Sequence, residues 1–384
     1  MMHRFGRILM IVALVVSIAR CASEPEPKRP PGGGSGAAPL PGAGVVLQPT
    51  SFSALPDWMR DRQGEAFPAL LRSCLRLERR TVDQPLGGDR RFGSIGEWQT
   101  ICAAARRFTP DDRFARRFFE EWFQPYAVFS DGTDQGLFTG YYEPLLRGSW
   151  QRKGPYRIPL HRPPVKGPKG SPSEIGLPNR SQIAAGALQG QGLELLWVDD
   201  PIDAFFLEIQ GSGRVQLDTG QVVRVGFAGK NGHSYFPIGR ELIRRGEVAQ
   251  EDMSRQAIRD WMKRHPDQAP GLMALNPSYV FFRLIDGDGP IGAQGVALTP
   301  ARSLAVDPSF VPYGVPVWLD TTDPIKPASP IRRLLIAQDT GGAIKGPIRG
   351  DVFWGGGAEA ESRAGMMKQA GRWYLLLPKA AATR

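Results

Sequence analysis

Short hydrophobic segments separated by glycine and proline fill the sequence after Gln135, and they constrain the fold more than any other feature. Each segment is rich in β-branched or aromatic residues and ends at turn residues, a pattern that predicts a strand. The predicted strands cover residues 136–143, 202–210, 221–228, 279–284, 295–298, 315–319, 334–338 and 373–377. A helical passage at residues 237–263 interrupts them. Many short strands with regular turns favour a mainly β fold built from barrels over a doubly wound sheet.

Helices are expected before these strands, between residues 55 and 126, where apolar residues recur at three- and four-residue spacing. A second helix is expected near residues 95–108. A third begins at Thr109-Pro110-Asp111-Asp112, where a Thr cap precedes Pro and two acids. Its aromatic residues are expected in the core: Phe114, Phe118, Phe119, Trp122 and Phe123.

The N-terminus has the pattern of an export signal. A short basic region containing Arg4 and Arg7 precedes an apolar run at residues 8–18, which is short for a membrane span and typical of a signal peptide. We expect residues 1–20 to form that signal and the protein to be periplasmic. The alternative is a short anchor that stays uncleaved. Residues 21–54, rich in Pro, Gly, Ala and Ser, are expected to form a flexible linker.

Cys21 directly follows the apolar run and is a candidate for lipidation, which would anchor the protein to the outer membrane. Ile18 fits a lipoprotein signal, but Arg20 occupies a place where a small residue is usual. Ordinary cleavage after Ser23 is the alternative. The other two cysteines, Cys74 and Cys102, lie in predicted helices, and an oxidising compartment permits a disulfide between them. Two buried free thiols are the alternative.

Composition excludes several classes of function. The formal net charge is +10, with 41% hydrophobic and 22% charged residues, as in a soluble protein with affinity for polyanions. The basic residues form no long run, so a nucleic-acid-binding tail is not expected. The four histidines lack metal-ligand spacing, and neither a nucleophile elbow nor a Walker loop is present. We therefore expect no metal and no cofactor.

One stretch imitates a dinucleotide-binding motif. Residues 287–292 match Gly-x-Gly-x-x-Gly, but Pro290 lies inside the match and a strand-like segment follows where such a site needs a helix. We interpret this stretch as a turn.

Two carboxylates in glycine-rich loops are the leading candidates for chemistry. Asp339 ends a predicted strand, and Asp351 begins another short one twelve residues later. Strand ends hold side chains at a rigid rim, and glycine lets a substrate approach the backbone. Lys345 and Arg349 lie between the two acids. Phe353 and Trp354 follow them and could stack on sugar rings. The alternative is that Asp351 is an ordinary turn aspartate, and the loop alone does not exclude it.

Two further segments have side chains suited to sugar binding. Residues 139–144 place Thr139, Tyr141 and Glu143 on a predicted strand, where rings could stack and oxygens could bind hydroxyl groups. Residues 208–213 offer the neutral hydrogen-bonding groups of Gln210 and Ser212. An ordinary tyrosine-rich strand and a plain turn are the respective alternatives.

These segments together resemble the membrane-bound lytic murein transglycosylase A family. The resemblance rests, in consistent order, on residues 139–144, 206–213, 235–240, 276–282, 298–307 and 339–355. The last two are similar to the 3D module, named for three aspartates that match Asp307, Asp339 and Asp351. The family's fold implies a double-psi β-barrel domain with added helices at residues 55–143 and 278–380, with the 3D module within 295–380. A smaller β-rich domain would be inserted at residues 144–277, and a groove between the domains would hold the glycan.

The resemblance also implies a reaction. Such enzymes cleave the β-1,4 bond between N-acetylmuramic acid and N-acetylglucosamine in peptidoglycan without adding water, and leave a 1,6-anhydro end. The family's catalytic aspartate matches Asp351, whose carboxyl would have to be protonated at the start of the cycle. We expect Asp339 to support it and Asp307 to be structural. The groove candidates are Thr139, Tyr141, Glu143, Gln210, Ser212 and Lys345.

Two alternatives remain open at the level of sequence. A glycan hydrolase on the same fold would need a second carboxylate across the groove, and Glu143 or Glu208 could serve. A non-catalytic wall-binding protein would bind the glycan strand and release nothing. The sequence does not identify protein partners.

Overall fold

A computed structural model describes residues 45–107, 111–164, 176–287 and 289–379. The expected signal peptide, the lipidation candidate Cys21, most of the expected linker and the Thr109-Pro110 helix start lie outside these residues. Within them, no helix combines the length and the apolar character needed to cross a membrane.

The first sheet has eight strands in the order β1-β2-β14-β11-β12-β10-β13-β3, and β14 also pairs with β3. The segment from β14 to β3 is therefore a closed circuit of hydrogen-bonded strand pairs. The strands are β1 (Val45–Pro49), β2 (Phe123–Ser130), β3 (Gly136–Glu143), β10 (Ser303–Val306), β11 (Pro316–Thr322), β12 (Pro330–Asp339), β13 (Arg349–Gly356) and β14 (Lys368–Pro378).

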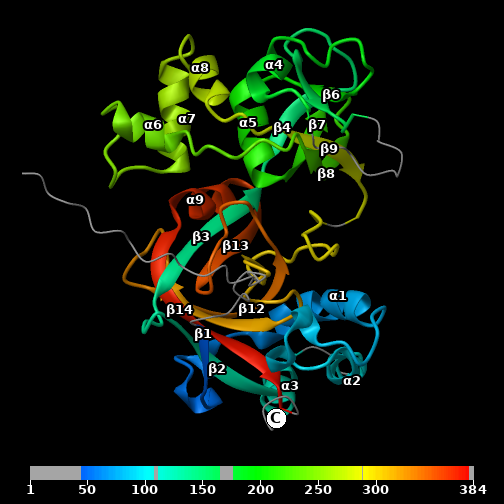
Figure 1. Cartoon of the computed structure of the whole chain (residues 1–384), viewed down its shortest axis with the longest axis vertical. Coiled ribbons are helices and arrows are strands. Elements are labelled where there is room, and N and C mark those ends of the chain that lie inside the picture. The colour runs from blue at the N-terminus through cyan, green and yellow to red at the C-terminus, as the bar shows by residue number, and fades with distance from the viewer. Residues whose placement is uncertain (1–44, 108–110, 165–175, 288, 380–384) are drawn as a thin grey trace, which may run out of the picture. The chain divides into compact units, whose positions relative to one another are not determined.

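Helices flank this sheet. The α-helices are α1 (Phe67–Leu77), α2 (Ile95–Ala105), α3 (Asp112–Trp122) and α9 (Ala358–Met366). The short 3-10 helices are η1 (Phe52–Ala54), η2 (Trp58–Arg60), η3 (Gln63–Ala66), η4 (Leu86–Gly88) and η5 (Arg90–Phe92). One hydrophobic core joins α1, α2 and α3 to the inner faces of the strands, with Phe67, Phe118 and Trp318 fully buried. Figure 1 shows α9 beside β3 and β13.

A glycine lets α9 approach the sheet closely. A Cβ added to Gly140 in β3 would lie 2.9 Å from the Cα of Ala364 in α9 and 2.6 Å from the Nε1 of Trp354. Since real Cβ atoms do not approach backbone this closely, only glycine fits here. The side chains of Thr139 and Tyr141, on either side of Gly140, point to the opposite face of β3 because strand side chains alternate.

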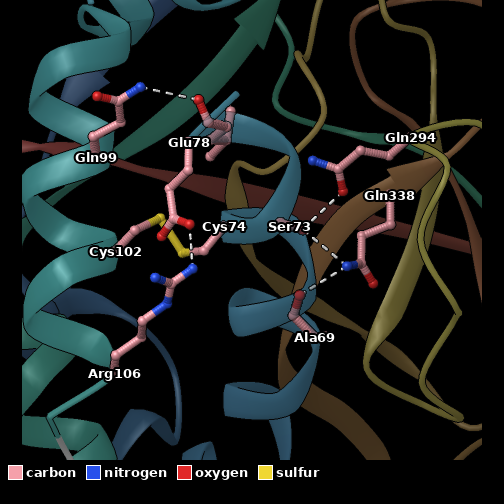
Figure 2. Close-up of a disulfide and its surroundings, with 10 residues drawn as sticks. Ala69, Ser73, Cys74, Glu78, Gln99, Cys102, Arg106, Gln294 and Gln338 are labelled. Carbon is pink, nitrogen blue, oxygen red and sulfur yellow. Dashed lines mark hydrogen bonds and ion pairs between the residues drawn. A yellow bond between two sulfur atoms is a disulfide. The ribbon is translucent and has the colours of Figure 1, made fainter. Parts of the chain in front are cut away.

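Cys74 in α1 and Cys102 in α2 form a disulfide, with their Cα atoms 5.5 Å apart. Figure 2 shows this bond between the two helices, with Ser73 on the side of α1 that faces the first sheet. The Ser73 hydroxyl donates to Gln294 and accepts from the side-chain amide of Gln338. The helix pair is thus joined both covalently and, through buried hydrogen bonds, to the strand that carries Asp339.

The second sheet has six strands in the order β5-β6-β4-β7-β8-β9. They are β4 (Leu145–Ser149), β5 (Ile158–His161), β6 (Glu194–Val198), β7 (Ser212–Leu217), β8 (Val222–Lys230) and β9 (Val280–Ile285). The accompanying helices are α4 (Arg180–Ala184), α5 (Pro201–Gln210), α6 (Gly239–Arg244), α7 (Arg255–Arg264) and α8 (Ala269–Ala274). This sheet has a hydrophobic core of its own around Leu196, Leu207 and Val215.

The structure corrects the prediction of a strand at residues 202–210, which form helix α5. The Asp200 carboxylate accepts hydrogen bonds from the amides of Ile202 and Asp203, Pro201 occupies the first turn, and Gly211 ends the helix with a φ of 76°. These are strong start and stop signals. The apolar run between them is buried on most sides, so its periodicity could not distinguish a helix from a strand.

Other predictions differ in detail. Residues 295–298 form no strand and contribute only an isolated bridge between Ile291 and Ala297. Residues 123–126 belong to β2 and not to a helix. The cap of α3 is Asp111, whose carboxylate accepts from the amide of Phe114. Phe114 itself is 47% exposed, so it is not a core residue.

Candidate active site

Strand pairing brings the candidate residues of β3, β12 and β13 together. β13 runs parallel to β3, and Asp351 is the register partner of Thr139. Asp339 ends β12, and the Tyr141 hydroxyl donates a hydrogen bond of 2.8 Å to its Oδ2. The fold therefore unites segments that lie about two hundred residues apart in the chain.

Asp351 is largely buried and has one side-chain hydrogen bond. Its Oδ1 accepts a hydrogen bond of 2.7 Å from the Thr139 hydroxyl, and within the described part of the chain its Oδ2 has no protein donor. Burial raises the pKa of Asp351 to about 6, against the lowering effects of the Thr139 hydrogen bond and the Arg349 charge, while Asp339 adds a smaller upward contribution. This carboxyl can hold a proton at mildly acidic pH and exchange it through Oδ2.

Arg349, two residues before Asp351, lies on the same face of β13. Its Nη2 donates a hydrogen bond of 2.8 Å to the Thr139 hydroxyl, and its Nη1 donates to the carbonyls of Gly350 and Leu137. Burial lowers the pKa of the guanidinium, and the Asp351 charge opposes that shift. The sequence shows only that the basic residue Arg349 lies between Asp339 and Asp351. It does not predict the hydrogen bond from Arg349 to Thr139.

Asp339 is held by three donors. In addition to Tyr141, the amides of Ala293 and Thr340 donate to its Oδ1 at 2.8 Å and 2.9 Å. Burial raises the pKa of Asp339 despite these hydrogen bonds. Burial, together with the Asp339 charge and its hydrogen bond, also raises the pKa of Tyr141 well above its usual value. Tyr141 therefore remains a neutral hydrogen-bond donor. Asp339 is oriented by this hydroxyl and by the amides of Ala293 and Thr340.

Asp307 shapes the loop between β12 and β13. Its carboxylate accepts from the amides of Ser309 and Gly346, at 3.1 Å and 2.9 Å, and the side chain is 4% exposed. Lys345, next to Gly346 in the same loop, is exposed. The geometry thus suits a structural role for Asp307 and leaves the Lys345 ammonium accessible to a ligand.

The structure overturns the idea that Phe353 and Trp354 could stack on sugar rings. Phe353 is 2% exposed and packs against Tyr141 with ring centroids 5.2 Å apart. Trp354 is 9% exposed, and the guanidinium groups of Arg333 and Arg363 both lie over its ring, 5.6 Å and 5.2 Å from the centroid. Alternation along β13 explains this arrangement, because this short strand is packed on both faces. The two rings can stiffen and dehydrate the site, but they are not open to a ligand.

Glu143 is not free to act in a groove. Its carboxylate is 5% exposed and forms ion pairs with Arg214 of β7 and Arg224 of β8, each at 3.2 Å. It therefore links the end of the first sheet's β3 to the second sheet. Glu208 is likewise buried, with bidentate hydrogen bonds of 2.8 Å from Arg180.

The other two groove candidates lie where α5 meets β7. The side-chain oxygen of Gln210 accepts a hydrogen bond of 3.0 Å from the amide of Tyr142, which positions the end of β3. Ser212 begins β7 and is partly exposed.

The sequence does not predict the hydrogen-bond network around Gln338 that supports the site. Gln338 is fully buried and donates to the carbonyl of Ala69 and to the Ser73 hydroxyl, each at 2.8 Å, while its oxygen accepts from Ser303. A polar residue inside an apolar strand just before Asp339 was the available signal, since buried amides need partners.

No three His, Cys, Asp or Glu side chains of the described residues are grouped so that they could hold a metal ion. A cavity of about 750 Å³ lies in the region of the second sheet and is lined by His161, Arg180 and Glu208 among others, but by neither Asp339 nor Asp351. The hydrogen-bonded carboxylates of Asp339 and Asp351 are the candidate site.

Two family models match the chain. The model described as "MltA specific insert domain" matches residues 137–283, and the model described as "3D domain" matches residues 302–377. The chain is 37% identical over 293 residues to "Membrane-bound lytic murein transglycosylase A" of Escherichia coli strain K12, an alignment that covers 74% of this chain and 75% of that protein.

Solved structures are similar as well. A membrane-bound lytic murein transglycosylase from Agrobacterium tumefaciens aligns with a TM-score of 0.78 and 33% identity, over 88% of this chain and 99% of that one. E. coli MltA with bound chitohexaose aligns with a TM-score of 0.66 and 30% identity, over 87% of this chain and 91% of that one.

Proposed function

The chain belongs to the membrane-bound lytic murein transglycosylase A family, and from this premise we propose that it cleaves the glycan strands of peptidoglycan with Asp351 as its acid and base. The bond would be the β-1,4 link between N-acetylmuramic acid and N-acetylglucosamine, and the product would carry a 1,6-anhydro end. The observation that carries the proposal is the Asp351 carboxyl, with a pKa raised to about 6 and Oδ2 unoccupied by other described residues.

The reaction needs only one carboxyl. Protonated Asp351 gives its proton to the glycosidic oxygen, and the bond from that oxygen to the muramic acid anomeric carbon breaks. The 6-hydroxyl of the same muramic acid attacks that carbon, and its proton passes to the Asp351 carboxylate. The enzyme is thereby restored without water. Since the nucleophile belongs to the substrate, no second carboxylate is needed to activate water, in contrast to a hydrolase.

The surroundings of the other carboxylates favour this reaction over hydrolysis. Glu143 and Glu208, the two candidates for a second catalytic carboxylate, are each held in buried ion pairs. A water-activating base needs an accessible, unpaired oxygen. Asp339 is engaged by three donors. We assign Asp339 the supporting role of disfavouring ionised Asp351 and fixing Tyr141.

The roles of the groove candidates follow from their hydrogen bonds, their ion pairs and their exposure. Thr139 orients Asp351, and Tyr141 orients Asp339. Lys345 and Ser212 present polar groups that could bind glycan hydroxyls or peptide carboxylates. Gln210 holds the backbone of β3, and we assign Glu143 a structural role in joining the two sheets.

The larger organisation follows from the same premise. Residues 55–143 and 278–380 would form the catalytic double-psi barrel domain, and residues 144–277 the inserted domain, with the glycan between them. The closed circuit of strand pairs from β14 to β3 supports such a barrel. The protein would act in the periplasm, and lipidation of Cys21 would tether it to the outer membrane.

Digestion of purified sacculi by the wild type and by Asp351→Asn tests the assignment. We expect the wild type to release anhydro-muropeptides and the variant to lose at least about a thousandfold in rate, because an amide cannot give a proton to the glycosidic oxygen. Asp218→Asn, which alters a carboxylate paired with Lys153 on the second sheet, is the matched control and should retain wild-type activity. Full activity of Asp351→Asn would overturn the residue assignment.

The affinity of the wild type and of Asp351→Asn for chitohexaose shows whether the substitution affects catalysis or glycan binding. E. coli MltA has been solved with this oligosaccharide, and we expect Asp351→Asn to bind it with an affinity within a few fold of the wild type. Binding to sacculi by the wild type without any released muropeptide would instead favour a non-catalytic wall-binding protein.

A further inference from the structure

The Arg349 guanidinium donates hydrogen bonds to both strands that carry Thr139 and Asp351, namely β3 and β13. Its Nη1 donates to the carbonyls of Gly350 on β13 and Leu137 on β3, and its Nη2 donates to the Thr139 hydroxyl at 2.8 Å. Both terminal nitrogens of the planar guanidinium are therefore engaged. Because Nη1 is held by backbone carbonyls, the position of Nη2 relative to Thr139 is fixed even though the aliphatic part of the Arg349 side chain is flexible.

A threonine hydroxyl has one proton and can donate only one hydrogen bond. When Arg349 donates to the Thr139 oxygen, that oxygen is an acceptor on this side. Its proton is then directed to Asp351 Oδ1, which lies 2.7 Å away. Without Arg349, both lone pairs of the hydroxyl oxygen would be free, and the hydroxyl could rotate and accept a hydrogen bond from protonated Asp351. The acidic proton would then lie on Oδ1, towards Thr139 and away from a ligand.

We propose that Arg349 is a positioning residue that acts through Thr139, and that it keeps the transferable proton of Asp351 on Oδ2. The chain of donors runs in one direction only, from the Arg349 guanidinium to the Thr139 hydroxyl to Oδ1. Oδ2 is thereby the oxygen that gives and receives the proton in both steps of the cycle. This inference rests on the proposed role of Asp351 as acid and base.

A direct charge effect of Arg349 on Asp351 is the competing explanation. The other charged or titratable groups that act on Asp351 are Asp339 of β12 and Tyr141 of β3. The paired strand β10 faces it with Ala305, which carries no charge. Arg349 is thus the only cation that lowers the pKa of Asp351 among the described residues. The two explanations differ in whether Thr139 is needed.

A double-mutant cycle separates the two explanations. Arg349→Met retains the aliphatic stem, and Thr139→Val retains the branched shape without the hydroxyl. Initial rates on sacculi give kcat and KM for both single variants and for the double variant. We expect Arg349→Met to lower kcat about tenfold with little change in KM, the effect of one misdirected hydrogen bond. In the Thr139→Val background the same change should have less than about a twofold effect.

Conservative variants provide the second readout. Thr139→Ser keeps the hydroxyl and should retain most of the activity. Arg349→Lys keeps the charge but cannot reproduce the fork, so it should resemble Arg349→Met. Additive effects in the cycle, or full activity of Arg349→Lys, would show that charge alone is responsible and would overturn the proposal.

A titration without substrate makes the inference independent of the proposed reaction. In protein labelled at aspartate carboxyl carbons, the ¹³C signal missing from Asp351→Asn identifies Asp351. Arg349→Met should shift its pKa upward by less in the Thr139→Val background than in the wild type. Equal shifts in both backgrounds contradict the relay. If sacculi yield no product with the wild type, the proposed function fails, and this titration still decides the relay.

Discussion

Burial controls the protonation of Asp351, and this has a consequence for activity. The carboxyl must be protonated to begin the cycle, and its pKa is raised to about 6 by desolvation. We therefore expect kcat/KM to fall as pH rises through about 6, by about tenfold per unit above it. A profile of initial rates on sacculi from acidic to mildly alkaline pH checks this. A rate that increases between pH 6 and pH 8 would contradict the acid role.

The same pKa has a consequence for stability. The folded state binds the Asp351 proton up to about pH 6, whereas the unfolded chain releases it near the ordinary value for Asp. Stability from this group is therefore fully present below the unfolded pKa and is lost as pH rises through the folded one. A difference of about two units corresponds to roughly 3 kcal/mol.

Asp351→Asn should remove the loss of stability that ionisation of the buried Asp351 carboxyl causes as pH rises. We expect the variant to unfold with a free energy roughly 1 to 3 kcal/mol higher than the wild type at pH 8, and nearly equal to it at pH 4. Urea unfolding at the two pH values measures the difference. Asp218→Asn is the control, because it removes a carboxylate that is paired with Lys153 and whose pKa is lowered by that hydrogen bond. It should therefore gain no stability at pH 8. Equal stability of Asp351→Asn and the wild type at pH 8 would contradict the burial.

At this scale, sequence indicated which residue types matter but not their surroundings. Asp339 and Asp351 were candidates because they lie at strand ends in glycine-rich loops. Whether burial or Arg349 would determine the Asp351 pKa depends on distances across β3 and β13, which a one-dimensional pattern does not contain. Phe353 was misinterpreted for the same reason, since an aromatic residue beside a candidate acid can equally line a groove or fill a core.

Among the elements, the pair α1 and α2 makes a separate prediction. The disulfide between Cys74 and Cys102 closes a loop with a sequence separation of 28. Replacing both cysteines with alanine should lower the free energy of unfolding by about 3 to 4 kcal/mol, chiefly by restoring freedom to the unfolded chain. Urea unfolding of the variant, and of reduced wild type as control, checks this value. A loss below about 1 kcal/mol would show that the helices hold together without the bond.

Glu143 marks the junction of the two sheets and distinguishes a structural from a catalytic carboxylate. Glu143→Gln leaves Arg214 and Arg224 without their partner, and we expect a loss of about 2 kcal/mol in unfolding free energy, reduced by the partial exposure of both arginines. The measurement is urea unfolding together with activity on sacculi. Unchanged stability with abolished activity would favour the hydrolase alternative, in which Glu143 activates water.

Elements with clear local signals were predictable. β3 begins and ends at the predicted residues, and the ends of α5 carried Asp200, Pro201 and Gly211. Nevertheless, α5 was predicted as a strand, because a buried apolar run gives no alternation to distinguish the two. The parallel pairing of β3 with β13 joins segments far apart in the chain. It follows from the closure of the sheet, which local propensity cannot reveal.

In the whole molecule, the order of the strands brings the site residues together more than any single motif does. The first sheet closes because β14 pairs with both β11 and β3. That closure places β3 beside β13 and brings Thr139 to Asp351. The many short strands favoured such a closed fold, whereas its detailed topology came from resemblance to a family. Family membership is now supported by both sequence and structural similarity.

The most direct test of the central claim is the fate of water in the reaction. Sacculi digested by the wild type in water enriched in oxygen-18 should release muropeptides that contain none of the heavy isotope. Each product should be lighter by one water than the corresponding hydrolysis product, because the muramic acid 6-hydroxyl supplies the nucleophile. Products with reducing ends that carry oxygen-18 would show that water attacks the anomeric carbon, and would contradict the single-carboxyl mechanism assigned to Asp351.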